Sequence, residues 1–427
     1  MILTYRILTT LIYPFLVILI FLRKIFHKED PERYKEKVFI SHFNVTRRKN
    51  KKLIWFHAAS IGELKSIIPI IEKINCERDI FDFLVTTTTV SSSHVANSEF
   101  IKFKNVYHRF FPLDVEFLIS RFLYLWKPDV IFLVDSEIWP NLIFKAKKNK
   151  IPLILINARI TYKTFKRWIR FPNTAKKIFN LFDLCLTANT ETKKFLTQLN
   201  AKNIFFHGNI KLINRDHKIN IQNVNENILL KNRFWFAANT HKGEDIFCLK
   251  THLEIKKKYK EIITIIAPRH IDRVKNIESI CKIFNLKSQI LNKNDLILAG
   301  KEIIIINSFG ILQNYFKYAK CVFIGKSTVK KLENEGGQNP IDAARLGCKI
   351  YHGPFVYNFE ESYKILNKLN ISKKIETFTE LSDLIIEDLT NPNKTNDKIP
   401  NLINDLGQKT LTDTMKIIND FLLNEVK

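Results

Sequence analysis

Two series of short apolar runs, each alternating with amphipathic segments, constrain the fold of this chain more than any other feature. The first series begins at residue 53 and the second at residue 234. Strands that alternate with helices predict mostly parallel sheets with helices on both faces. The predicted strands are Leu53–His57, Phe83–Thr87, Val130–Val134, Leu153–Asn157 and Leu184–Thr187, followed by Phe234–Ala237, Ile262–Ala267, Ser288–Leu291, Ile303–Ile306, Cys321–Ile324 and Lys349–Tyr351.

The two series predict two domains joined by a linker. The chain has 427 residues, which is too long for one ordinary domain. Polar, Asn-rich sequence interrupts the apolar periodicity near residues 208–230. We therefore expect two Rossmann-like domains of the α/β class facing a central cleft, because ligands of open α/β sheets bind at the carboxyl ends of the strands. The expected domains are residues 29–210 and 231–400, with a linker at 211–230 and a C-terminal helix at 401–427.

The N-terminal segment predicts a membrane anchor. Residues 7–22 read ILTTLIYPFLVILIFL, and Arg23, Lys24 and Lys28 follow. A full membrane span needs about 20 apolar residues, so this run is at the lower limit. No small-residue cleavage site follows it, which argues against a secretory signal. We expect residues 1–28 to be an uncleaved anchor, spanning or lying in the interface, with its basic flank on the cytoplasmic side. A buried core helix is the alternative, but the segment lacks a polar face.

Composition narrows the classes of function. The formal charge of +26 suggests an anionic partner, either nucleic acid, a membrane surface or a phosphorylated substrate. The lysines are dispersed along the chain, whereas nucleic-acid binding favours one basic face with stacking aromatics. No G-x-G-x-x-G, P-loop or H-E-x-x-H pattern is present, so a dinucleotide, P-loop chemistry and a catalytic metal have no support. The six cysteines have no paired spacing, as is typical of a reducing compartment.

Charged residues follow several strands of the first series. Glu63 lies in the turn of WFHAASIGELKS, where its carboxylate can either face a cleft or complement the helix dipole. Asp135 and Glu137 lie in DSEIWPN, either as ligand-binding acids or as a helix cap with first-turn acids. Lys211 follows Gly208 at the predicted linker, and in so Lys-rich a chain it carries little information by itself.

The second series predicts a nucleotide-sugar site. The segment Pro268–His270 follows a strand, and its Arg and His suit phosphate or carboxylate binding, although a solvated surface pair is the alternative. In GGQNPIDAAR, the paired glycines permit close backbone approach to a ligand. Asn339 and Pro340 favour a helix start with free N–H groups for a phosphate. Asp342 is suited to accept hydrogen bonds from ribose hydroxyls.

Nine motifs together resemble the Kdo transferases of lipopolysaccharide synthesis. In order, they are HAASIGE, TTTTVSS, DSEIWPN, INARIT, HGNIKL, AANTHKGED, APRHIDR, GGQNPIDAARLG and HGPFVYNF. That family transfers 3-deoxy-D-manno-octulosonic acid (Kdo) from its CMP-activated form to a lipid A precursor. The resemblance extends from the N-terminus to about residue 365. It implies an inverting GT-B glycosyltransferase with no catalytic metal or other cofactor, acting at the cytoplasmic face of the inner membrane.

The resemblance also implies roles for particular residues. Glu63 matches the family's general base, Asp135 an acidic position associated with the transition state, and Lys211 a basic one. The family usually has Glu where Asp135, Ile311 and Asp342 stand, and His where Gln338 stands. Ile311 lacks the carboxylate, so the resemblance implies only a backbone contact there. The positions that match CMP-contacting loops are Pro268, Arg269, Gly310, Ile311, Leu312, Asn339, Pro340, Ile341 and Asp342.

The predicted partners follow from this resemblance. They are a CMP-Kdo donor, a lipid IVA acceptor and anionic lipids of the inner membrane, without nucleic acid. Three alternatives remain from the residues alone: a GT-B transferase for another nucleotide sugar, a basic protein that binds membranes or nucleic acid, and a non-catalytic membrane scaffold. The retained Glu63 and Arg269 argue against the scaffold.

Overall fold

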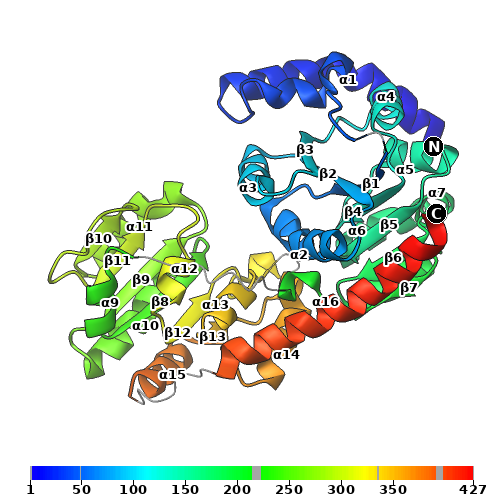
Figure 1. Ribbon diagram of the computed structural model, residues 1–427. Helices are drawn as coiled ribbons and strands as arrows, with labels where there is room; N and C mark the ends of the chain where they lie inside the picture. The colour runs from blue at the N-terminus through cyan, green and yellow to red at the C-terminus, as the bar shows by residue number, and fades with distance from the viewer. Residues whose placement is uncertain (1, 49, 214–222, 334–335, 391–397, 427) are drawn as a thin grey trace. The chain divides into compact units, whose positions relative to one another are not determined.

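The computed structural model describes residues 2–48, 50–213, 223–333, 336–390 and 398–426. The chain divides into two compact units, one formed by Met1–Arg215 with Leu406–Lys427 and the other by Asp216–Asp405. Each unit contains a seven-stranded parallel sheet with flanking helices (Figure 1). The prediction of two Rossmann-like α/β domains is confirmed.

The sheet of the first unit has the strand order β3-β2-β1-β4-β5-β6-β7. The order reverses between β1 and β4, which pair directly, so this is the topological switch point where open α/β sheets bind ligands. The strands are β1 (Lys52–His57), β2 (Phe81–Thr87), β3 (Val106–Phe110), β4 (Val130–Val134), β5 (Leu153–Ala158), β6 (Leu184–Thr187) and β7 (Ile204–Phe205).

Helices cover both faces of this sheet because its central strands are apolar on both sides. Trp55 joins one core cluster and its neighbour Phe56 joins the other, as the alternation of side chains along a strand requires. The C-terminal helix α16 (Lys398–Glu425) adds Met415 and Ile418 to the second cluster. The other α-helices that follow β1 in this unit are α2 (Ile61–Glu77), α3 (Val90–Phe100), α4 (Glu116–Trp126), α5 (Pro140–Lys148), α6 (Tyr162–Ile169), α7 (Pro172–Phe179) and α8 (Thr190–Gln198).

The N-terminal helix α1 (Ile2–Ile25) is long and apolar enough to cross a membrane. It also lies beside α4 of the first unit (Figure 1). The Tyr5 hydroxyl donates to Asp114 at 3.0 Å, and the Tyr13 hydroxyl donates to the carbonyl of Val38 at 2.6 Å. Ile20 is buried against Tyr34 and Val38, but many other apolar side chains of the helix are exposed, among them Phe15 at 71%. The helix therefore contacts the first unit along one edge and leaves its apolar side uncovered.

The sheet of the second unit has the strand order β10-β11-β9-β8-β12-β13-β14, with its switch point between β8 and β12. Its strands are β8 (Phe234–Thr240), β9 (Ile263–Pro268), β10 (Ser288–Leu291), β11 (Ile303–Ile306), β12 (Cys321–Ile324), β13 (Lys349–His352) and β14 (Ser372–Lys374). Its helices are α9 (Glu226–Lys231), α10 (Glu244–Lys258), α11 (Val274–Ile283), α12 (Gln313–Phe316), α13 (Ile341–Arg345), α14 (Glu360–Lys368) and α15 (Phe378–Thr390).

The structure gives bounds for the predicted linker and for the predicted C-terminal helix. Of the predicted linker at 211–230, residues 214–222 lie outside the described part of the chain. Lys211 belongs to a 3₁₀ helix, η3 (Ile210–Leu212), in the first unit, and α9 belongs to the second. The helix predicted at 401–427 begins at Lys398, and from Leu406 onward it is part of the first unit.

Candidate active site

The switch point of the first sheet brings together the loops that follow β1 and β4. Because the two strands are parallel neighbours, their carboxyl ends lie at the same edge. Glu63 follows β1 in the first turn of α2, and Asp135 is the first residue after β4. Two of the three predicted catalytic residues therefore lie at the point where the topology favours a ligand.

Glu63 combines a structural role with a perturbed carboxylate. Ser60 is the N-cap of α2, and its hydroxyl donates to Glu63 Oε1 at 2.7 Å. The amide of Ala59, the residue before the N-cap, donates to Glu63 Oε2 at 2.7 Å, so both oxygens of the carboxylate bond to the turn that begins the helix. Burial raises the pKa of Glu63, and the negative charges of Asp135 and Glu137 raise it further against the opposing bond from Ser60. A carboxylate with a raised pKa is suited to accept a proton near neutral pH.

Asp135 is held in an unusual backbone conformation and carries one unsatisfied oxygen. Its φ of 63° lies in the left-handed region, which Asp tolerates better than most residues. The side chain is buried, and Oδ2 accepts a hydrogen bond from Lys211 Nζ at 2.6 Å. Oδ1 is buried without a hydrogen-bond partner among the described residues. Buried carboxylate oxygens normally have partners, so Oδ1 is available to a ligand donor.

Lys211 reaches Asp135 because the HGNIKL segment is fixed on the first unit. The Asn209 side chain accepts from the amide of Lys211 at 2.9 Å. Asn157, at the end of β5, accepts from the amide of Ile210 at 3.1 Å. Gly208 has a φ of 106° and lies against Thr410 of α16, where a Cβ would come within 2.7 Å of the hydroxyl. The third predicted catalytic residue therefore joins the other two.

A second pair lies beside this group, and sequence reasoning named only one of its members, Glu137. His57, at the end of β1, is fully buried, and its Nε2 lies 3.3 Å from Glu137 Oε2. Trp139 Nε1 donates to the same oxygen at 2.7 Å. The His57 ring stacks on Phe111 with 3.9 Å between centroids. The available signal was the quoted motifs HAASIGE and DSEIWPN, which contain His57, Glu137 and Trp139.

The predicted donor residues lie in loops at the carboxyl edge of the second sheet. Pro268 ends β9, and the exposed Arg269 follows it, with its amide bonded to the carbonyl of Thr240 at 3.1 Å. Gly310, with a φ of 77°, and the buried Ile311 follow β11, and Leu312 caps α12. Ile311 is 7% exposed, which leaves little of its surface for a ligand.

The last predicted donor segment forms the start of α13. Asn339 Oδ1 accepts from the amide of Ile341 at 3.1 Å, and Pro340 is the N-cap of the helix. The Asp342 side chain lies 3.7 Å from Arg345. Gly336, just before this segment, passes so close to the carbonyl of Phe355 that a Cβ would lie 2.2 Å from it. The paired glycines thus serve backbone packing as well as any ligand.

Glu244 organises the switch point of the second sheet, and sequence reasoning missed it. The residue is fully buried at the start of α10. Its Oε2 accepts from the amides of His241 at 2.8 Å and Lys326 at 2.6 Å. Its Oε1 accepts from the amide of Ser327 at 2.8 Å, and from the amide and hydroxyl of Thr328 at 3.0 Å each. One carboxylate therefore ties the loop after β8 to the loop after β12. The available signal was the motif AANTHKGED, which contains it.

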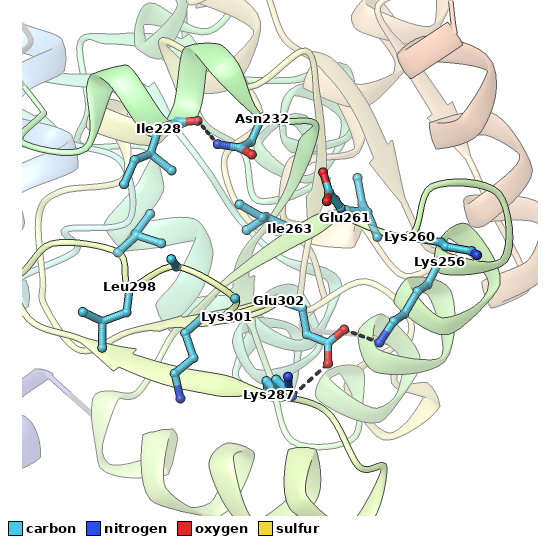
Figure 2. A pocket seen from close by; sticks show the side chains of 14 residues that line it. Ile228, Asn232, Lys256, Lys260, Glu261, Ile263, Lys287, Leu298, Lys301 and Glu302 are labelled. Atoms are coloured by element: carbon cyan, nitrogen blue, oxygen red, sulfur yellow. Dashed lines mark hydrogen bonds and ion pairs between the residues drawn. The ribbon is translucent and has the colours of Figure 1, made fainter.

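A pocket of about 600 Å³ in the second unit lies away from these loops. It is lined by residues that precede β9, β10 and β11, including Glu261, Lys287 and Lys301. Figure 2 shows Glu302 between Lys256, with which it forms an ion pair, and the amide of Lys287 at 2.9 Å. This is the amino edge of a parallel sheet, opposite the edge that binds ligands in such folds. The pocket is therefore separate from the candidate donor site.

Solved structures with the same architecture define the class. A glycosyltransferase from Rickettsia africae aligns with a TM-score of 0.57 at 10% identity, covering 88% of this chain and 100% of that one. A UDP-GlcNAc 2-epimerase from Neisseria meningitidis aligns with a TM-score of 0.55 at 15% identity, covering 87% of this chain and 99% of that one. Both likenesses concern the fold, which is that of the GT-B proteins. The same fold serves transferases and epimerases, so it does not by itself fix the reaction.

Sequence comparisons resolve the reaction within that class. Residues 32–214 match the family model described as 3-deoxy-D-manno-octulosonic-acid transferase (kdotransferase). A 3-deoxy-D-manno-octulosonic acid transferase of Rickettsia bellii is 29% identical over 98% of this chain and 99% of its own length. A probable mitochondrial 3-deoxy-D-manno-octulosonic acid transferase of Arabidopsis thaliana is 30% identical over 91% of this chain and 88% of its own length. The chain belongs to the Kdo transferase family.

Proposed function

We propose that this Kdo transferase moves Kdo from CMP-Kdo to the lipid A precursor lipid IVA, with inversion at the anomeric carbon. The observation that carries the proposal is the group formed by Glu63, Asp135 and Lys211 at the switch point of the first unit. Glu63 is a proton acceptor with a raised pKa, and the ion pair of Asp135 and Lys211 lies in the same group. Attack by a sugar hydroxyl requires a group that accepts its proton and charges that stabilise the transition state.

In the proposed reaction, Glu63 takes the proton of the acceptor hydroxyl as its oxygen attacks the anomeric carbon. The bond between that carbon and the CMP phosphate oxygen breaks, and CMP leaves with the bonding electrons. Asp135 accepts a hydrogen bond from the bound sugars through Oδ1, which has no partner in the described part of the chain. Lys211 and Arg269 supply positive charge as the negative charge of CMP develops, so the proposal assigns no catalytic metal or other cofactor.

The donor is assigned to the second unit. Arg269 suits the CMP phosphate because a guanidinium binds phosphate oxygens in a planar, bidentate manner. The loop at Gly310–Leu312 and the segment at Asn339–Asp342 are proposed to contact the rest of the nucleotide. Glu244 does not contact the donor in this proposal but holds two switch-point loops in place.

The proposed location is the cytoplasmic face of the inner membrane. Helix α1 has the length and apolarity of a membrane segment, and most of its apolar side chains are exposed. The net charge of +26 complements anionic lipid headgroups and a phosphorylated acceptor. The proposal includes no nucleic-acid partner.

The test is transfer by the purified full-length protein. CMP release and product mass are measured with CMP-Kdo and lipid IVA, with and without EDTA. We expect transfer that survives EDTA, competition by CMP rather than UDP, and a loss of at least a hundredfold in Glu63→Gln. A donor preference for a UDP-sugar supports the alternative GT-B transferase instead. Near-normal turnover of Glu63→Gln contradicts the assignment of the base.

A further inference from the structure

A cavity of the first unit lies between α1 and the carboxyl ends of the sheet. Its volume is about 180 Å³. Its lining includes Ile20 of α1, Leu113 in the loop after β3 and Trp139 in the loop after β4. The other lining residues are Glu29, Lys37, Thr88, Phe111, Pro112 and Asp114.

The charged groups around this cavity are already engaged with one another. Glu29 accepts from Arg23 Nε at 2.7 Å and forms an ion pair with Lys37. Lys37 Nζ also donates to the carbonyl of Thr88 at 2.8 Å. Asp114 accepts from Tyr5 and from the amides of α5. What remains for a ligand is apolar surface, so an apolar group suits the cavity better than a polar one.

Residues that line the cavity belong to the apolar helix or form hydrogen bonds with neighbours of the candidate base. On the helix side, Ile20 belongs to the same helix as many exposed apolar residues. On the sheet side, the Thr88 hydroxyl donates to the carbonyl of Ala59 at 2.9 Å, and the amide of Ala59 donates to Glu63. Trp139 donates to Glu137, whose charge raises the pKa of Glu63.

We propose that this cavity binds part of an acyl chain of the lipid acceptor. The inference rests on the proposed function. A cavity of about 150 Å³ lined by aliphatic and aromatic side chains holds a benzene molecule, so this one has room for a segment of a chain. A chain seated there fixes the position of the attached sugar relative to Glu63. The cavity thus selects acylated acceptors rather than free sugar phosphates.

The experiment fills the cavity from two sides. Leu113→Trp and Ile20→Trp place an indole in it, whereas Leu11→Trp adds the same group at a position of α1 that is 67% exposed. Steady-state kinetics are measured with lipid IVA and with its deacylated phosphorylated disaccharide. We expect both cavity variants to raise KM for lipid IVA at least tenfold. We expect no change in KM for CMP-Kdo or in activity on the deacylated sugar, and no change in Leu11→Trp.

A photoreactive lipid IVA with a diazirine in one acyl chain tests occupancy independently of turnover. Labelling of the loop around Leu113 in the wild type, lost in Leu113→Trp, supports the proposal. Labelling confined to the outward side of α1 overturns it, as does an unchanged KM for lipid IVA in both cavity variants. If the lipid labels the cavity specifically but the enzyme transfers Kdo to neither acceptor, the result contradicts the proposed function and still supports this lipid site.

Discussion

The ammonium of Lys211 lies 2.6 Å from Asp135 Oδ2, although 76 residues separate the two in the chain. The pair is mostly buried, with side-chain exposures of 21% and 10%. It occupies one carboxylate oxygen and leaves the other buried without a partner among the described residues. The ion pair therefore leaves one oxygen of Asp135 able to accept a further hydrogen bond.

Removing the ammonium tests this arrangement. Lys211→Met removes the cation proposed to stabilise the negative charge that develops on CMP, and it also removes the ion-pair partner of Asp135. We therefore expect kcat to fall by about 10²–10³-fold. The matched control is Lys147→Met, which breaks a 2.8 Å ion pair with Asp183 just before β6, at the amino edge of the same sheet. We expect the control to stay within about threefold of wild type. Equal losses in the two variants indicate that Lys211 has only a structural role.

The pH dependence of transfer tests the base. Glu63 must be deprotonated to act, and its raised pKa places the acid limb of kcat/KM above the ordinary value of 4.5 for Glu. Glu137→Gln removes one negative charge that raises this pKa, so we expect the acid limb to move to lower pH. The pH profile of Glu63→Asp provides the comparison, because it retains a titrating carboxylate. An acid limb unaffected by Glu137→Gln contradicts the coupling between the two carboxylates.

Glu244→Gln tests the organisation of the donor loops. The substitution replaces one accepting oxygen with an NH₂ group facing backbone donors, so buried N–H groups lose their acceptor. We expect a loss of about 1–3 kcal/mol in the free energy of unfolding of the second unit for each N–H group left without an acceptor, together with weaker CMP binding. Urea unfolding and calorimetry measure the two effects. Glu254→Gln, on the same helix but in an exposed ion pair with Lys257, is expected to change stability by less than about 0.5 kcal/mol.

His252 makes the second unit sensitive to acid. It is fully buried, and burial lowers its pKa from 6.5 to about 4. Below pH 6.5 the unfolded chain binds a proton that the folded protein does not, so acidification favours unfolding. From about pH 7.5 to 5 this amounts to about 2 kcal/mol. We expect His252→Gln to lose that part of the pH dependence in urea unfolding, whereas the exposed His94→Gln retains it. Equal slopes in the two variants contradict a neutral His252.

The strands illustrate how far the sequence predicts this fold. Continuous apolar runs such as Val130–Val134 and Cys321–Ile324 were predicted with the bounds of β4 and β12, because strands buried on both faces need apolar residues throughout. The predicted strands did not include β3, β7 and β14, which read VYHRF, IF and SKK. All three lie at sheet edges, where a strand needs fewer apolar residues to be stable.

The sequence by itself determined the two-domain α/β class, the apolar N-terminal segment and the motifs that mark a Kdo transferase, since these depend on local pattern and composition. Only the tertiary structure decided which charged residues meet. Lys211 is one of 68 Lys and Arg residues, and nothing in its local sequence directs it to Asp135. The pairing follows from the strand order and from the bond between Asn157 and Ile210. Likewise, Glu244 resembles any first-turn acid until the fold brings the loops after β8 and β12 to its carboxylate, because long-range packing and burial are absent from a linear pattern.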